Sequence, residues 1–183
     1  RPGMVTGILG CAAQLPIRHP KQYERMDKWH RFVLANARHA PRILPFVVQA
    51  GFAVARKMGK EAFLRQVHSG SPADIALMDA PDTREALLLG SEICLSRHHS
   101  AHEAFTRECI GSEKDWSEVI RSCRVPVTLL QGDQDPQSPI LTVRELAEEY
   151  PQLEVECLSG NGQFLFFREW KTVLDRLHPM INA

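Results

Sequence analysis

Short apolar runs of strand length occur near the start of the chain and in its last third. The first covers residues 4–11, and two more cover residues 125–131 and 153–158. A continuous apolar run is typical of a strand buried on both faces, as strands of parallel sheets usually are. The last two runs are each followed by a helical pattern, at about 139–150 and about 168–178. This strand–helix–strand–helix order predicts right-handed parallel crossovers in one sheet.

The segment between the first two runs is helical in pattern, with breaks at proline and glycine. Residues 43–54 are apolar nearly all round, which is typical of a buried helix or of the wall of a ligand tunnel. Ser71, followed by Pro72 and by Asp74 at the third helical position, predicts the start of a helix, and Pro81 begins another. Three- and four-residue spacing gives the first helix one apolar face, made of Tyr23, Met26, Trp29, Val33 and Ala37.

The pattern therefore predicts an α/β fold, with a partial parallel sheet of about three strands and a large helical insertion after the first strand. We expect one domain in three parts: a strand and exit loop at 1–19, a helical block at 20–112 and a C-terminal α/β part at 113–183. Because a buried-type strand stands at the first residues, we expect the chain to begin within a domain. The strand at 4–11 would then pair, on its other side, with missing N-terminal residues or with a second chain.

Composition adds a few limits. The 183 residues are 44% hydrophobic and 24% charged, as in a globular domain with a sizeable core. Lys+Arg and Asp+Glu both number 22, so no overall field favours nucleic acid or an anionic membrane, although a local patch is left open. Five widely spaced cysteines indicate reduced thiols in a cytoplasmic protein. The sequence has no secretory signal and no apolar run of about 18 residues, which predicts that no segment spans a membrane.

Two loops in the last third carry candidate chemistry. Residues 125–136 have the sequence VPVTLLQGDQDP, an apolar run that ends in Gly-Asp-x-Asp, and residues 160–165 have the sequence GNGQFL. These strings resemble the C-terminal part of α/β-hydrolase-fold proteins. There, the first loop carries the acid of a catalytic triad, and a later Gly-x-Gly-His-Phe loop carries the general base. The resemblance implies that the helical block is a cap over the active site. Ligands of open parallel sheets bind beyond the carboxyl ends of the strands, where both loops lie.

The resemblance assigns the acid position to Asp135 and the base position to Gln163. An amide has no protonation change near neutral pH, so Gln163 cannot take a proton from a nucleophile. It can still donate a hydrogen bond to Asp135 and hold the shape of its loop. Asp133 and Phe164 are candidate ligand-binding residues beside them. Ordinary turn chemistry is the alternative for the aspartates, and aromatic packing is the alternative for the phenylalanine.

The nucleophile of such a triad lies in a Gly-x-Ser-x-Gly elbow between a strand and a helix, and this sequence contains no such string. The nearest is Ser69-Gly70-Ser71-Pro72, which lies between helical patterns and fits a loop followed by a helix cap. In the family, the nucleophile and the oxyanion hole precede the strand with which this chain begins, so we expect them in another polypeptide segment. Because loss of one triad member costs several orders of magnitude in rate, we expect this chain alone to be inactive.

A histidine could serve as a substitute base or as a metal ligand. His98 and His102 are four residues apart, beside His99 and Glu103, and this spacing on one helix face could hold a metal. No distant third ligand is evident, so a solvated helix face is the favoured interpretation. We therefore expect no metal and no cofactor.

The remaining candidate histidines do not occupy the triad position. His178 near the C-terminus suits the end of a helix, where positive charge is favourable. His19 follows the first strand and could face the cleft, and His68 lies in the helical block. The sequence alone assigns neither of them as the base.

The run from Gln163 to Phe167 adds a finer resemblance, to hydrolase-like domains fused to helix-turn-helix transcription regulators. It implies a bacterial cytoplasmic regulator whose hydrolase-like half binds a small molecule, with nucleic acid contacted only through an upstream domain. Two functions follow from the sequence. The first is a non-catalytic module for ligand sensing or interaction. The second is the cap and C-terminal portion of a genuine serine hydrolase, acting on an ester or a similar acyl substrate.

Overall fold

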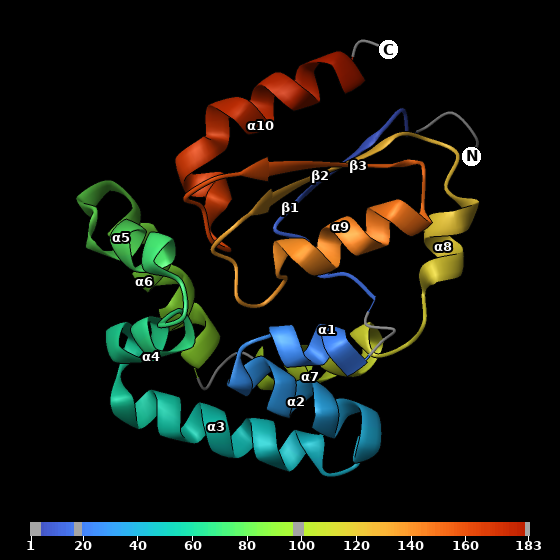
Figure 1. Ribbon diagram of the computed structural model, residues 1–183. Coiled ribbons are helices and arrows are strands. Elements are labelled where there is room, and N and C mark those ends of the chain that lie inside the picture. Colours follow the sequence, from blue (N-terminus) through green and yellow to red (C-terminus); the bar gives the residue numbers. More distant parts are fainter. Residues whose placement is uncertain (1–4, 17–19, 97–100, 182–183) are drawn as a thin grey trace. The chain divides into compact units, whose positions relative to one another are not determined.

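The computed structural model describes residues 5–16, 20–96 and 101–181 (Figure 1). Its contacts divide the chain into two compact units. We call them the sheet unit (1–15, 71–74 and 116–183) and the helical unit (16–70 and 75–115). The block predicted as helical thus falls in the helical unit, apart from the short stretch 71–74, which packs in the sheet unit.

Three parallel strands of the described residues form a sheet in the order β1-β2-β3. They are β1 (Ile8–Cys11), β2 (Val127–Gly132) and β3 (Leu153–Leu158). Val127 is level with Ile8 on one side and with Leu153 on the other. The parallel sheet predicted from the apolar runs is confirmed. β2 is buried along its whole length because it has a neighbour on each side.

Helices pack against both faces of this sheet (Figure 1). α8 (Ser117–Ser122) precedes β2, α9 (Ile140–Glu149) follows it, and α10 (Leu165–Ile181) follows β3. Successive strand residues point to opposite faces. Leu129 of β2 therefore packs in the core with α9, whereas Leu130 packs with α10. This alternation explains why a continuous apolar run, rather than an alternating one, marks β2 in the sequence.

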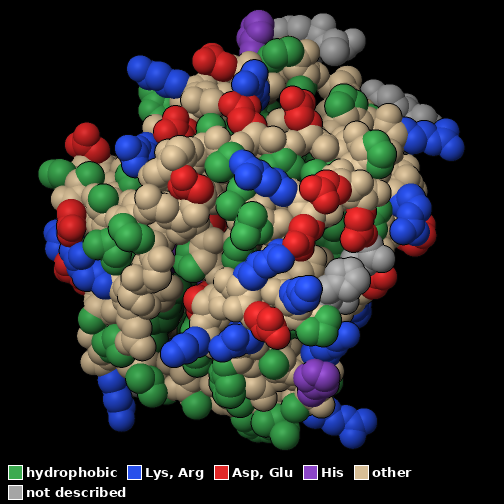
Figure 2. Space-filling model, viewed as in Figure 1, with side chains coloured by type: hydrophobic (Ala, Val, Ile, Leu, Met, Phe, Trp, Pro, Cys, Tyr) green, Lys and Arg blue, Asp and Glu red, His purple; other side chains and the backbone are tan. Residues whose placement is uncertain are grey.

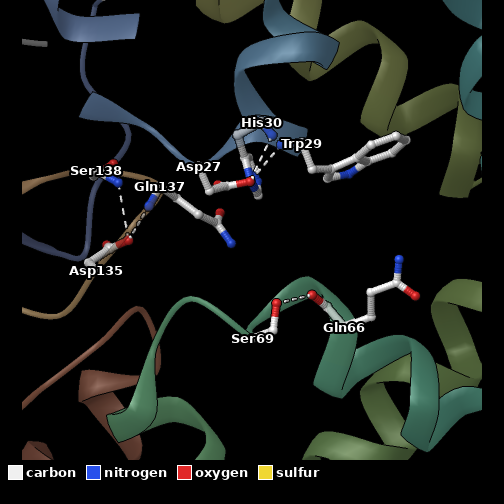
Figure 3. A network of polar contacts seen from close by, with 8 residues as sticks. All are labelled: Asp27, Trp29, His30, Gln66, Ser69, Asp135, Gln137 and Ser138. Atoms are coloured by element: carbon white, nitrogen blue, oxygen red, sulfur yellow. Dashed lines mark hydrogen bonds and ion pairs between the residues drawn. The ribbon is translucent and has the colours of Figure 1, made fainter. Parts of the chain in front are cut away.

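The helical unit has its own core, in which Val33, Leu44, Val48 and Cys109 pack together. Asp27 caps the second helix, where its carboxylate accepts backbone hydrogen bonds from two residues of the first turn (Figure 3). The helices of this unit are α1 (Pro20–Arg25), α2 (Lys28–His39), α3 (Leu44–Met58), α4 (Lys60–Val67), α6 (Pro81–Leu95), α7 (Ala101–Ser112) and the later part of α5 (Pro72–Asp79).

Two predicted helix starts are confirmed. α5 begins at Pro72, and the backbone N–H of Asp74 donates to Ser71 Oγ at 3.2 Å, as expected for a serine cap. α6 begins at Pro81, which occupies its first turn. Local chemistry alone was sufficient to place both starts.

β1 differs from its prediction. The sequence predicts a buried strand over residues 4–11, whereas β1 covers Ile8–Cys11 and Val5 is 55% exposed. Among the described residues, β1 has a neighbour only on the β2 side, so it is an edge strand. The predicted burial is therefore wrong for these residues. A partner along the other edge of β1 stays a prediction.

The prediction of a helix buried all round over residues 43–54 is also wrong. Leu44 and Val48 on the inner side of α3 are buried, whereas Phe46 is 71% exposed. Two pockets of the helical unit are lined by residues outside this segment, and the alternative of a tunnel wall stays a prediction. Within residues 5–16, 20–96 and 101–181, no helix has both the length and the apolar character that crossing a bilayer requires.

Candidate functional site

Asp135 lies in the turn that follows β2, at the carboxyl end of the sheet. One carboxylate oxygen, Oδ1, accepts hydrogen bonds from the backbone N–H groups of Gln137 at 2.8 Å and Ser138 at 3.1 Å (Figure 3). The other, Oδ2, accepts from the Gln131 side chain at 2.8 Å. A carboxylate has about four acceptor positions. Asp135 therefore uses three of them within its own strand and loop.

Burial dominates the electrostatics of Asp135, which is only 4% exposed. Loss of hydration raises the pKa of Asp135, and the nearby negative charge of Asp74 raises it further. The three hydrogen bonds to the carboxylate oppose this rise without cancelling it. Burial therefore disfavours the charged form of the Asp135 carboxylate, and its three hydrogen-bond donors stabilise that form in part.

The loop that carries Gln163 is anchored by Asp74, a residue far away in the sequence. Asp74 Oδ2 accepts a hydrogen bond from the backbone N–H of Gln163 at 3.1 Å, and Oδ1 accepts from that of Phe164 at 3.0 Å. Asp74 is completely buried, and its carboxylate therefore makes charge-assisted bonds in a site without water competition. These two bonds fix the chain immediately before α10.

Close packing completes this anchor. Gly162 lies so near the start of α5 that an added Cβ would overlap with Ser71 Oγ and Asp74 Oδ1. The stretch 71–74 is also tied to the loop after β2, because the backbone N–H of Ala73 donates to Gln134 Oε1 at 3.1 Å. The N–H of Gln134 in turn donates to the carbonyl of residue 161 at 2.9 Å. The start of α5 and the two loops therefore form one hydrogen-bonded assembly.

The Gln163 side chain does not act as the sequence suggests. The hydrogen-bond partners of Asp135 are Gln131, Gln137 and Ser138, so the expected bond from Gln163 is not formed. Instead, Gln163 Oε1 is buried and accepts no hydrogen bond from any described residue. Its loop keeps its shape through the backbone bonds to Asp74, rather than through the amide side chain.

Asp133 and Phe164 lie beside these two positions. Asp133 is exposed and accepts hydrogen bonds from Ser159 Oγ and from the N–H of Gly160, both at 2.8 Å. These bonds hold the pKa of Asp133 below its usual range. The Phe164 ring packs edge-on against Phe167, with centroids 6.1 Å apart. Both arrangements match the alternatives of turn chemistry and aromatic packing, and ligand binding by either residue stays a prediction.

Histidine does not complete a triad within the sheet unit. In the sequence of this unit the sole histidine is His178, in the last turn of α10. The end of α10 lies at the amino edge of the sheet, since the Thr6 hydroxyl donates to the carbonyl of Met180 and Gly7 lies against the Met180 side chain. Asp135 lies at the opposite edge, about 20 Å away along a six-residue strand.

The other candidate histidines fall within the sequence of the helical unit. His68 is buried in the helical unit, and the His102 ring lies 6.2 Å from that of Phe52. His19, His98 and His99 lie outside the described residues, so the proposed pairing of His98 with His102 is not tested. Within the described ranges, no group of His, Cys, Asp and Glu side chains is arranged to hold a metal ion.

Sequence reasoning missed the role of Asp74. It identified Asp74 only as an acid in the first turn of a helix, although the same side chain anchors the base-position loop. Local sequence contained no signal for this contact, because its partners lie about 90 residues later in the chain. The pair Gly162 and Gln163 offered an indirect hint, since a glycine often marks a close approach of the backbone to another group.

Comparison with known proteins supports the fold. No family model and no curated protein sequence matches the chain. The structure is similar to an α/β hydrolase from a deep-sea metagenome library (TM-score 0.55, 13% identity, 100% of this chain and 58% of that one). It is also similar to a bromoperoxidase from Bacillus anthracis (TM-score 0.59, 14% identity, 97% of this chain and 58% of that one). A third similar structure is an esterase from Exiguobacterium antarcticum (TM-score 0.58, 12% identity, 97% of this chain and 57% of that one).

These likenesses define the class. The chain has a partial α/β-hydrolase fold, with three parallel strands and a helical cap inserted after the first strand. The identities are too low to show more than the fold. The chain spans 57% to 58% of the length of the three structures named above, so the activity of a whole protein is a matter for proposal.

Proposed function

We propose that the sheet unit is a hydrolase-like module that binds a small molecule without catalysing a reaction and serves ligand sensing or interaction. The observation that carries the proposal is Gln163. The loop at the base position presents an amide, and the buried Asp74 holds that loop through two backbone hydrogen bonds. A loop held in this way keeps its shape without providing a proton acceptor.

The surroundings of Asp135 support the same proposal. In a serine hydrolase, the triad acid orients a histidine and stabilises its charged form. Here Gln131 and two backbone N–H groups already bond to the Asp135 carboxylate. His178, the one histidine in the sequence of the sheet unit, lies at the far edge of the sheet. Asp135 therefore serves to stabilise the turn after β2.

The ligand that best fits is an uncharged small molecule with a hydrogen-bond donor. Gln163 Oε1 is buried without a partner among the described residues, and leaving such a carbonyl unpaired costs about 1–3 kcal/mol. A ligand hydroxyl or amide N–H would satisfy it, and Phe164 would offer aromatic surface beside it. A carboxylate ligand is disfavoured because Asp74 and Asp135 already place two acids in this part of the unit.

Ester hydrolysis tests the absence of catalysis. With p-nitrophenyl acetate and p-nitrophenyl butyrate, we expect the full-length protein that contains this chain to give no turnover above that of its Asp135→Ala variant. The Gln163→His variant should also stay at this background, because the proposal holds that no activated nucleophile is present. Wild-type turnover that the Asp135→Ala variant abolishes would overturn the proposal.

The alternative is the cap and C-terminal portion of a genuine serine hydrolase, in which Asp135 works with an upstream serine and a different base. The similarity to a structure named as an esterase favours it. A fluorophosphonate probe distinguishes the two functions, because it reacts covalently with an activated serine. Labelling of the full-length protein would support the alternative, whereas no labelling together with no turnover would support the sensing module.

The free edge of β1 is where this module would receive a partner. Ile8 and Ala12 donate hydrogen bonds to residues on the β2 side, so the N–H groups of Leu9 and Cys11 point to the other edge. We propose that an N-terminal segment of the same protein, or a second chain, pairs along this edge. Nucleic acid would then be contacted only through a domain carried by that upstream segment. Slow hydrogen exchange at Leu9 and Cys11 would support pairing, and fast exchange at both would contradict it.

A further inference from the structure

The charges of the chain are unevenly distributed along its sequence. Residues 28–60 contain seven of the 22 Lys and Arg residues and none of the 22 Asp and Glu residues. The rest of the chain then has 15 basic and 22 acidic residues, a net charge of −7, against +7 in this segment. The whole segment lies in the helical unit. A zero net charge therefore conceals a basic segment. Lys60 at its end is paired with Glu92 of α6, and Arg38 lies near Glu113, so the cations of this segment without such an acid matter most for a local field.

The same segment contains α3, whose outer side is apolar and exposed. Residues 43–55, which include most of α3, have no charged side chain. The outer side of the helix includes Phe46 and Val54, which are 71% and 59% exposed. Arg42 and Lys57 are exposed at the two ends of this side, and neither forms an ion pair with a described residue. The outer side of α3 is thus apolar in the middle and basic at both ends.

Aromatic side chains of α2 widen this surface. A Cβ placed on Gly51 of α3 would lie 3.6 Å from the Trp29 ring, so the indole lies directly against α3. The Phe32 ring stacks on Trp29 with centroids 5.9 Å apart, and both rings are about half exposed. We call the combined surface the basic apolar face; its main residues are Trp29, Phe32, Arg42, Phe46, Val54 and Lys57.

We propose that the basic apolar face docks on the surface of an anionic lipid bilayer, with α3 lying in the headgroup layer. Helices that lie in this layer combine an apolar side with flanking Lys and Arg residues. Tryptophan is enriched at the same depth, and each cation near the surface is attracted by anionic headgroups. Figure 2 shows hydrophobic and basic side chains together in the part of the view where Figure 1 draws α3.

Two other occupants fit the basic apolar face less well. A second copy of the chain would bring the same face against itself, so Arg42 and Lys57 would lie near the same cations of the other copy. A single acidic helix or peptide would need a groove to hold it. A pocket of about 680 Å³ in the helical unit is lined instead by residues of α4, α5 and α6. A flat anionic surface needs neither self-complementarity nor a groove.

Vesicle co-sedimentation tests the proposal on the intact chain. We expect binding to vesicles of phosphatidylcholine mixed with phosphatidylserine, little binding to pure phosphatidylcholine, and a fall in binding as NaCl is raised. The double substitution Arg42→Gln with Lys57→Gln should weaken binding by more than about tenfold, since each cation contributes to the attraction. Phe46→Asp should weaken it as well. Val54→Asp is a second probe of the apolar side should Phe46→Asp fail to fold.

Matched controls come from α9 of the sheet unit. Leu141 is 56% exposed and Arg144 is exposed, so Leu141→Asp and Arg144→Gln make the same chemical changes outside the face and should leave binding unchanged. Binding that survives both Phe46→Asp and Val54→Asp would overturn the proposal, as would no binding to anionic vesicles. Binding to poly-glutamate but not to these vesicles would overturn it in favour of an acidic protein partner. Self-association that Phe46→Asp abolishes, without vesicle binding, would overturn it in favour of a second copy.

Discussion

Removing the Asp74 carboxylate should loosen the base-position loop and destabilise the sheet unit. Asp74→Ala eliminates the two acceptors that bind the backbone N–H groups of Gln163 and Phe164, at 3.1 Å and 3.0 Å. Because Asp74 is completely buried, water cannot readily take the place of the lost carboxylate. The substitution therefore leaves two backbone donors unpaired in the interior of the unit.

The expected magnitude follows from these two bonds. A hydrogen bond to a charged group contributes about 1.5–3 kcal/mol, so two of them suggest a loss of about 3–6 kcal/mol. Relief of the repulsion between Asp74 and Asp135 returns part of this loss. We expect Asp74→Ala to lower the free energy of unfolding by about 3–5 kcal/mol, a large share of the about 5–15 kcal/mol typical of a domain. Asp74→Asn should cost less, because the amide oxygen still accepts one of the two bonds.

Urea denaturation measures this loss, and hydrogen exchange locates it. The Gln163 and Phe164 amides should exchange slowly in the wild type and rapidly in Asp74→Ala. Asp82→Ala is the control, since Asp82 is likewise an acid in the first turn of a helix but is exposed. The control removes a favourable interaction with the helix dipole of only about 0.3–1 kcal/mol.

The outcome that would refute this reasoning is specific. If Asp74→Ala lost no more stability than Asp82→Ala, the two bonds of Asp74 would not hold the loop. If stability fell by several kcal/mol while the Gln163 and Phe164 amides stayed protected, the loss would arise elsewhere in the unit. Either result would also remove the main support for a base-position loop that keeps its shape without its side chain.

Two further predictions concern the same loops. Gly162→Ala should destabilise the protein by about 1–3 kcal/mol, because its Cβ would overlap with the buried start of α5. Gly90→Ala is the control: this residue lies in open space on α6, and the substitution should stabilise the protein by about 0.5–1 kcal/mol. Urea denaturation of both variants measures the two changes, and equal effects would contradict the prediction. Asp135 and Asp133 should affect the pH dependence of stability with opposite signs. The raised pKa of Asp135 stabilises the folded state fully below the usual Asp pKa of about 3.9, and this contribution is lost as pH rises through the folded pKa, so wild type should lose stability relative to Asp135→Asn as pH rises. The lowered pKa of Asp133 contributes stability above about pH 3.9, and this contribution is lost as pH falls through the folded pKa. Wild type should therefore lose stability relative to Asp133→Asn as pH falls. Urea denaturation across acidic pH measures both trends, and a trend of the same sign for the two variants would contradict these pKa directions.

The last third of the fold was predictable because each of its elements is specified locally. The run that became β2 is apolar at successive positions, since its two faces pack against different helices. The starts of α5 and α6 follow from serine and proline at positions where the backbone requires them. Patterns of this kind need no knowledge of distant partners, and they placed both candidate loops at the carboxyl edge of the sheet.

Predictions failed where burial depends on what lies beside an element. The apolar residues of α3 fit a fully buried helix, yet one side is exposed because no described element of the helical unit covers it. The run at 4–11 fits a buried strand, yet β1 is an edge in the described sheet. The hydrophobic pattern of a segment shows which side chains are suited to burial. Whether a neighbour is present is decided by tertiary structure, or by a partner of the kind proposed for both surfaces.

Gln163 shows why the shape of a loop and its chemistry must be judged separately. The Asp74 carboxylate and the close approach at Gly162 fix the backbone of this loop, and neither contact involves the Gln163 side chain. The side chain at this position can therefore be an amide without loss of the loop, while the Asp135 turn is satisfied by its own donors. The backbone of this loop can therefore keep its shape whether or not its side chain accepts a proton. The unpaired Gln163 Oε1, rather than the resemblance in loop shape, should guide the search for a ligand.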